Sequence, residues 1–183
     1  MELLDYVKYM LTGLGNNLLV TGVTFFVLLI PGILLTLLSK KFPIVGKIFG
    51  WLSIPFECIC PIIFFMIIYW GFATLTGGKT LPMTLVTIFC LILSFAGYMP
   101  ARYTPEYSIL KNILYHGLGM LSDIFKWSFT AHVIGFTGLY YFANIIRRQT
   151  YRMMESFIIP LIISIVILLF IEIARRIIKQ FMK

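Results

Sequence analysis

Acidic and basic side chains inside long apolar segments are the residues of this sequence that could do chemistry. Glu57 lies about one turn inside such a segment, where a carboxylate is costly unless it is paired or hydrated. We interpret it either as a solute or gating contact or as a group that pairs with Lys47 or Lys111. Asp123 and Lys126 are three residues apart, so on a helix they share one face. Their spacing favours a structural ion pair, and the alternative is contact with a zwitterionic solute along a transport path.

Histidine and cysteine form no metal-binding or catalytic pattern. His116 and His132 have no carboxylate or cysteine at a metal-ligand spacing. Cys58, Cys60 and Cys90 lie in apolar segments, where a free cysteine behaves as a small hydrophobic residue. The sequence contains no phosphate-binding glycine loop and no nucleophile elbow. We therefore predict no catalytic residue, no metal and no cofactor.

A cluster of basic residues precedes the last apolar segment and consists of Arg147, Arg148 and Arg152. Such a cluster either receives the acidic face of another protein or anchors to phospholipid headgroups. The formal net charge is +8, but the basic residues flank apolar segments instead of forming one patch. This placement is typical of membrane topology and argues against a nucleic-acid partner.

The composition indicates a membrane protein. Hydrophobic residues make up 60% of the 183 positions and charged residues only 12%, which is too apolar for a soluble domain. We predict an all-α integral membrane protein, a single transmembrane domain over 1–183 with about five transmembrane helices of about 20 residues each. A short partial or re-entrant helix on the outer side is added to these. The predicted spans are 18–38, 54–75, 81–99, 109–129 and 156–178, and the partial helix is 131–146.

Basic residues also predict which connections face the cytoplasm. The connection after the first span carries Lys40, Lys41 and Lys47, so by the positive-inside rule it is cytoplasmic. The N-terminus, with acidic Glu2 and Asp5, is then outside. The C-terminus is expected to be cytoplasmic because it is basic, and an odd number of spans satisfies both ends. Its basic residues are Arg175, Arg176, Lys179 and Lys183.

Two pairs of glycines predict close helix packing. Gly13 and Gly15 lie near the start of the chain, and Gly117 and Gly119 lie in the fourth predicted span. Glycine lets the backbones of two membrane helices approach each other. We therefore expect both pairs to lie at helix–helix contacts.

The order of residues between 126 and 155 is more specific than its hydrophobicity. Lys126 and Ser128 are followed by Ala131-His132-Val133-Ile134-Gly135 and then by Thr150-Tyr151-Arg152-Met153-Met154-Glu155. This order resembles the C-terminal signature of the permease subunits of ABC importers for polar amino acids. Upstream, Pro61 with Tyr69 and Gly71, and Ala96-Gly97-Tyr98, are similar to the second and third spans of that family.

The resemblance implies a subunit that moves amino acids or similar small polar solutes by alternating access. It implies three protein partners in addition to membrane lipid: a cytoplasmic ATPase subunit, a second permease subunit in a homo- or heterodimer, and an external solute-binding protein. ATP hydrolysis would belong to the ATPase, so this chain is predicted not to be an enzyme. The implied location is the bacterial inner membrane.

One feature of the family is missing. Its members carry a Glu-Ala-Ala loop between the third and fourth spans, and this loop docks on the ATPase. Here only 99–108 is available, which is too short for the docking helix and leaves Arg102 and Glu106 as the candidate ATPase-facing residues. The alternative function is therefore a non-transporting scaffold, assembly factor or sensor derived from such a permease.

Overall fold

The elements of the described chain are all helices, which confirms the predicted all-α class. The structure, a computed structural model, describes residues 3–58, 61–78, 81–102, 104, 106–150 and 153–181. Its helices are α1 (Leu3–Lys41), α2 (Pro43–Cys58), α3 (Pro61–Leu75), α4 (Met83–Phe95), α5 (Tyr98–Ala101), α6 (Ile109–Ser128), the 3-10 helix η1 (Phe129–Ile134), α7 (Leu139–Thr150) and α8 (Met153–Phe181).

Several of these helices are long and apolar enough to cross a bilayer, so the chain is an integral membrane protein. Three qualify within the described residues: Tyr6–Lys41, Met83–Ala101 and Ser156–Gln180. A fourth crossing results if the bent pair Ile109–Ile134 and Leu139–Thr150 counts as one span. The α8 window is only 11% buried, and large apolar side chains from Ile158 to Ile177 are exposed along it, as expected for a surface that faces lipid.

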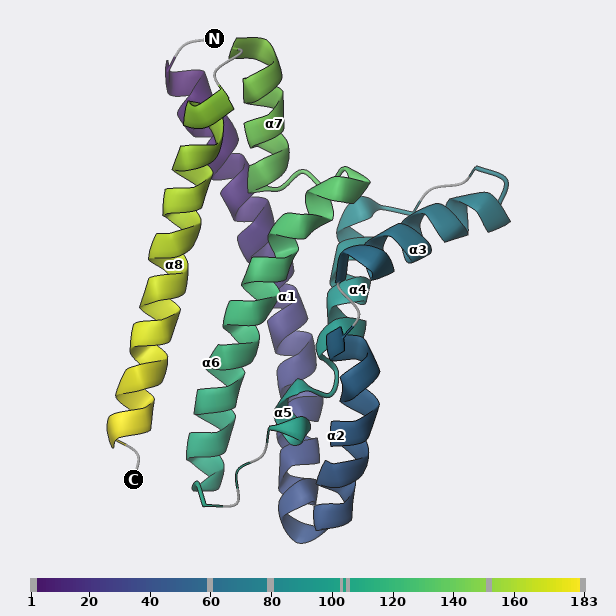
Figure 1. Cartoon of the computed structure of the whole chain (residues 1–183), viewed down its shortest axis with the longest axis vertical. Coiled ribbons are helices and arrows are strands. Elements are labelled where there is room, and N and C mark those ends of the chain that lie inside the picture. The colour runs from purple at the N-terminus through teal and green to yellow at the C-terminus, as the bar shows by residue number, and fades with distance from the viewer. Residues whose placement is uncertain are drawn as a thin grey trace.

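Helix α1 is the central support of the fold. It runs along most of the molecule and packs against α6, α7, α4, α2 and α5 (Figure 1). Its inward face is the more polar one: Asn17, Thr21 and Thr24 are buried, whereas Leu19 and Phe26 are exposed. A polar buried face and an apolar exposed face are typical of a membrane helix. Moving an apolar side chain from lipid into the protein gains little free energy, whereas small and polar side chains allow helices to pack closely. The first predicted span, 18–38, thus lies in the C-terminal half of one helix that begins at Leu3 and ends at Lys41.

The predicted span 54–75 is divided between two helices. α2 ends at Cys58 and α3 begins at Pro61, and α3 projects sideways from the bundle (Figure 1). Pro61 has no backbone N–H to donate to a preceding turn, so a helix begins at it more readily than it passes through it. The 15 residues of α3 give a length of about 23 Å, shorter than the hydrocarbon core of about 30 Å.

The predicted partial helix 131–146 is also interrupted. η1 ends at Gly135, which has φ +86° and so adopts a left-handed conformation that suits glycine. α7 begins only at Leu139 and is bent by 46° from the α6–η1 direction. The buried Asn17 side chain closes this break. Its Nδ2 donates to Ser128 Oγ at 2.9 Å, and its Oδ1 accepts from Leu139 N at 2.7 Å.

Helix α1 and α7 approach so closely that only glycine fits at one position. A Cβ on Gly13 would lie 2.8 Å from Leu139 Cα and 2.9 Å from Gly138 O, whereas a Cβ on Gly15 would meet nothing within 4 Å. The close packing predicted for this pair therefore holds for Gly13 and not for Gly15.

We predict that Gly13→Ala destabilises the protein while Gly15→Ala does not. Overpacking against backbone costs about 1–3 kcal/mol, which lowers the melting temperature of a chain of this size by about 2–12 °C. At Gly15 the added methyl meets open space and favours the helix by about 0.5–1 kcal/mol. Thermal unfolding of the two purified variants in the same detergent measures this. Equal losses of stability at both positions would contradict the packing described here.

Candidate functional site

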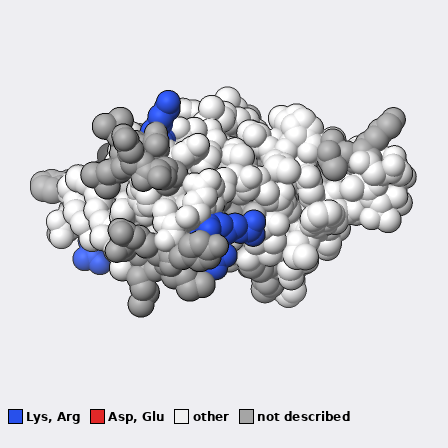
Figure 2. Space-filling view, turned by 90° about the horizontal axis from the view of Figure 1, so that it is seen from above, with Lys and Arg blue, Asp and Glu red and all other residues white. Residues whose placement is uncertain are grey.

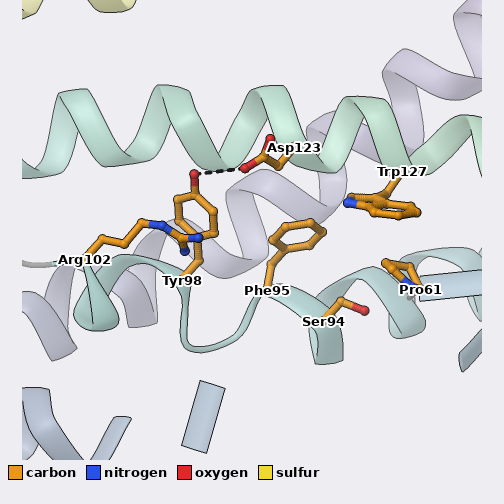
Figure 3. Close-up of a pocket in the computed structure, with 7 residues that line it drawn as sticks. All are labelled: Pro61, Ser94, Phe95, Tyr98, Arg102, Asp123 and Trp127. Carbon is orange, nitrogen blue, oxygen red and sulfur yellow. Dashed lines mark hydrogen bonds between the residues drawn. The ribbon is translucent and has the colours of Figure 1, made fainter. Parts of the chain in front are cut away.

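A cavity of about 170 Å³ lies between α6 and the connected pair α4–α5 (Figure 3). It brings together two of the charged residues singled out in the sequence, Asp123 from α6 and Arg102 just after α5. The other lining residues come from four helices, α3, α4, α5 and α6, and are mostly apolar or aromatic. They are Pro61, Ser94, Phe95, Tyr98 and Trp127.

Each carboxylate oxygen of Asp123 has a polar partner. Tyr98 donates its hydroxyl to Oδ2 at 3.0 Å, and Lys126 Nζ lies 3.0 Å from Oδ1. The ion pair expected from the spacing of Asp123 and Lys126 is therefore confirmed. The Lys126 side chain remains 52% exposed, so the pair contributes little to stability and mainly orients the carboxylate. Each oxygen can still accept a further hydrogen bond, for example from a bound solute.

Arg102 supplies the opposite charge. Its Cζ lies 3.8 Å from the centroid of the Tyr98 ring, a stacked cation–π contact that fixes the side chain. Tyr98 therefore lies between the two charges: its ring carries the guanidinium and its hydroxyl binds the carboxylate (Figure 3). A cation and an anion in one small cavity complement a zwitterion.

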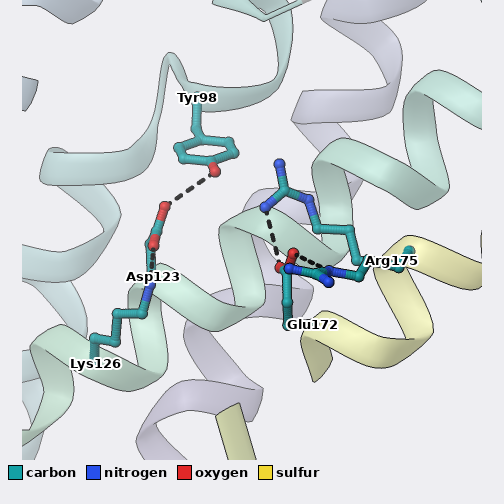
Figure 4. A network of polar contacts seen from close by, with 6 residues as sticks. Tyr98, Asp123, Lys126, Glu172 and Arg175 are labelled. Carbon is teal, nitrogen blue, oxygen red and sulfur yellow. Dashed lines mark hydrogen bonds and ion pairs between the residues drawn. The ribbon is translucent and has the colours of Figure 1, made fainter. Parts of the chain in front are cut away.

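A second, separate group of polar contacts lies on α8 near the cavity (Figure 4). Glu172 pairs with Arg175 and Arg176 at 3.4 Å each, and Arg175 stacks over the ring of Tyr115 at 4.4 Å. A Cβ on Gly119 would lie 2.9 Å from the Tyr98 hydroxyl and 3.7 Å from Arg175. Tyr98 and Arg175 therefore meet across a glycine on α6, as expected if this glycine serves close packing.

The remaining predicted residues lie elsewhere. Glu57 belongs to α2, but its side chain lies outside the described part of the structure, as does the whole of Arg152. Glu106 is exposed in the short connection between α5 and α6, away from the cavity. Arg147 and Arg148 lie in the last turn of α7, at the other end of the molecule from that connection (Figure 1).

The connection between α5 and α6 is closed by one buried side chain. Asn112 Oδ1 accepts from Thr104 N at 2.9 Å, and its Nδ2 donates to Thr104 O at 2.8 Å and to Tyr107 O at 3.1 Å. Ser108 caps α6 by accepting from Lys111 N. The described residues of the connection are therefore tied to the start of α6.

Sequence reasoning missed the aromatic part of the cavity. Tyr98 was noted in the Ala96-Gly97-Tyr98 turn but was not proposed as a site residue, and Phe95 and Trp127 had no distinguishing signal. A tyrosine directly after a small-small turn and close to a buried acid is the pattern that could have indicated Tyr98.

Similarity to known proteins is limited to structure. No protein-family model matches the chain, and no curated protein matches it either. Its fold is similar to that of a chain in the solved "Crystal structure of an amino acid ABC transporter with histidines". The TM-score is 0.77 at 19% identity, over 97% of this chain and 95% of that chain. The protein thus has the fold of that transporter chain over nearly its whole length, which supports at the level of the fold the resemblance seen in the sequence.

We predict that Tyr98→Phe lowers stability more than Tyr115→Phe does. The first change removes a hydrogen bond to a carboxylate, worth about 1.5–3 kcal/mol, or about 3–12 °C in melting temperature. The hydroxyl of Tyr115 has no hydrogen-bond partner among the described residues, so its removal should be nearly neutral. Thermal unfolding compares the two. An indistinguishable pair of melting temperatures would show that the Tyr98–Asp123 bond is not formed.

Proposed function

We propose that this chain is the transmembrane subunit of an ABC-type transporter and moves amino acids or similar small polar solutes by alternating access. The observation that carries the proposal is the similarity in fold to a chain of an amino acid ABC transporter, which extends over 97% of the chain. The residue order from Lys126 to Gly135 supports the same class independently.

The Tyr98 cavity is the proposed solute contact in this subunit. Asp123 would accept from the ammonium group of an amino acid and Arg102 would bind its carboxylate, a pairing for which guanidinium geometry is well suited. The volume of about 170 Å³ suits a small solute. Lys126 holds the second Asp123 oxygen, so it positions the carboxylate instead of competing with the solute for both oxygens.

The proposed partners are a cytoplasmic ATPase, a second permease subunit and an external solute-binding protein. ATP hydrolysis would take place on the ATPase and not on this chain. The tight loop that contains Glu106, tied to α6 by Asn112, is the proposed ATPase-facing surface. A rigid loop can transmit a displacement to α6, and through Arg102 to the cavity.

The charge distribution supports an N-terminus outside and a C-terminus in the cytoplasm, and the resemblance to ABC importers supports the bacterial inner membrane as the location. At the end of the bundle formed by the α1–α2 hairpin, the α5–α6 loop and the end of α8, basic residues outnumber the acidic Glu106 and Glu172. By the positive-inside rule this end is cytoplasmic. The basic residues are Lys40, Lys41, Lys47, Arg102, Lys111, Arg175, Arg176 and Lys179.

Affinity purification from native membranes tests the proposed class. The tagged chain should co-purify with an ATPase and a permease partner, as identified by mass spectrometry. A reproducible partner set that lacks any ATPase would overturn the transporter proposal in favour of a scaffold or sensor.

We predict that Asp123→Asn reduces uptake by the purified complex about tenfold or more, since losing a charged contact of at least about 1.4 kcal/mol changes affinity tenfold. Uptake of a radiolabelled amino-acid mixture into proteoliposomes, with ATP supplied on the ATPase side, measures it. Glu172→Gln is the control, because it removes an equal charge from α8, at a half-exposed position that does not line the cavity. Full uptake by the Asp123 variant would remove the cavity from the solute path without affecting the proposed class.

We predict that cysteine labelling will show the proposed orientation of the chain in the membrane. In a chain whose three native cysteines are replaced by alanine, Lys41→Cys and Lys179→Cys should react with an impermeant maleimide only from the cytoplasmic side. Leu75→Cys, 88% exposed at the tip of α3, should react only from outside. Labelling of all three from one side would contradict the proposed topology.

A further inference from the structure

A second cavity, of about 220 Å³, lies between η1 and α7 and is independent of the proposed transport site. Four of its lining residues, Tyr141, Asn144, Ile145 and Arg148, lie on one face of α7, because their spacing matches successive turns of a helix. The opposite face, which includes Leu139, Ala143 and Ile146, is fully buried. The fifth lining residue, His132, faces α7 from η1.

The polar groups of this cavity are available to a ligand. Tyr141, Asn144 and Arg148 have no side-chain hydrogen bond or ion pair with any described residue. His132 Nδ1 lies 2.8 Å from Phe129 O, so it donates to that carbonyl and the ring is held in place. Among the described residues, the lining contains a guanidinium and an amide as strong donors and no carboxylate. This set of groups favours a ligand with anionic oxygens.

The depth of the cavity can be read from the lipid-facing surface of α8. Exposed apolar residues begin at Ile158 and continue to Phe170, before the first charged residue, Glu172. The hydrocarbon core therefore begins on the outer side near Ile158. Phe157, at the start of that surface, stacks with Tyr140 at 6.3 Å, and Tyr140 stacks in turn with His132 at 6.3 Å. The floor of the cavity therefore lies at the edge of the hydrocarbon core.

From this floor the cavity rises through the headgroup layer. α7 runs away from the centre of the bundle beside the start of α1 (Figure 1). Asn144 is about 6 Å and Arg148 about 12 Å beyond Tyr140 along the helix, and a headgroup layer is about 5–7 Å thick. The long Arg148 side chain can reach back into that layer. The end view shows Lys and Arg side chains and no Asp or Glu among the described surface residues (Figure 2).

We propose that this cavity binds the phosphate group of a phospholipid headgroup. Arg148 would bind two phosphate oxygens, Asn144 Nδ2 and the Tyr141 hydroxyl would donate to the remaining ones, and Ile145 would contact the glycerol. A bilayer presents this chemistry at the depth of the cavity. The neighbouring Arg147 does not line the cavity and is the matched control for charge.

Native mass spectrometry of the purified chain in detergent tests the proposal without any transport assay. Phosphatidylglycerol, a diacylglycerol with the same acyl chains and inorganic phosphate are titrated separately. We expect phosphatidylglycerol to bind at least tenfold more tightly than diacylglycerol and inorganic phosphate. Arg148→Gln should weaken its binding about tenfold, Asn144→Ala by a smaller factor, and Arg147→Gln by less than twofold.

Three results would overturn the proposal. Equal affinity for phosphatidylglycerol and diacylglycerol would mean that the phosphate is not recognised. Equal losses in Arg148→Gln and Arg147→Gln would mean that only net charge attracts the lipid. Binding of inorganic phosphate as tightly as of the lipid would assign the cavity to a free anion. Circular dichroism of each variant confirms its fold, and Arg148→Lys, which retains the charge but not the paired geometry, should bind with intermediate affinity.

Discussion

The buried amide of Asn17 is the contact on which the other arrangements depend. Its side chain bonds to Ser128, at the end of α6, and also to the backbone N–H of Leu139, the first residue of α7. Leu139 is 122 residues away from Asn17 in the sequence. Inside a bilayer no water replaces a missing partner, so an interrupted helix survives only where another part of the protein satisfies its exposed backbone groups. Asn17 does this from α1, and Asn16 adds a bond of 2.6 Å to Thr137 O. The break in turn positions both η1 and α7, and with them the second cavity.

Both cavities are built from pieces that no single helix contains. The first needs the turn after α4, which places Tyr98 opposite Asp123 of α6. The second needs η1 and α7 to meet at the bend, so that His132 of η1 and Arg148 of α7 line one cavity. Each cavity also contains a tyrosine and an arginine: Tyr98 with Arg102, and Tyr141 with Arg148. The helices pack as in an ordinary bundle, and both cavities form where the helices are interrupted.

Local sequence patterns predicted what depends on local geometry. The Asp123–Lys126 pair follows from helical spacing, and the three long apolar helices of the described chain follow from apolar length. The spacing of Gly13 and Gly15 could not show that only Gly13 faces α7, because that depends on the rotation of α1 in the bundle. Nor could it predict that Arg102 turns into a cavity while Glu106 stays exposed, since the two are four residues apart in one connection. The role of Asn17 depends on a partner that lies far away in sequence.

The exposed surface of α8 affects which substitutions this sequence can tolerate. Different apolar side chains are about equally stable in contact with lipid. Most positions from Ile158 to Ile177 therefore require a hydrophobic residue but not one of a particular shape. The requirement for a particular residue falls instead on a few small and polar positions, such as Gly13, Asn17, Gly119 and Gly138, where a single added carbon would meet backbone or a polar group. Two chains of this fold can therefore differ at most of their residues and still have almost the same packing.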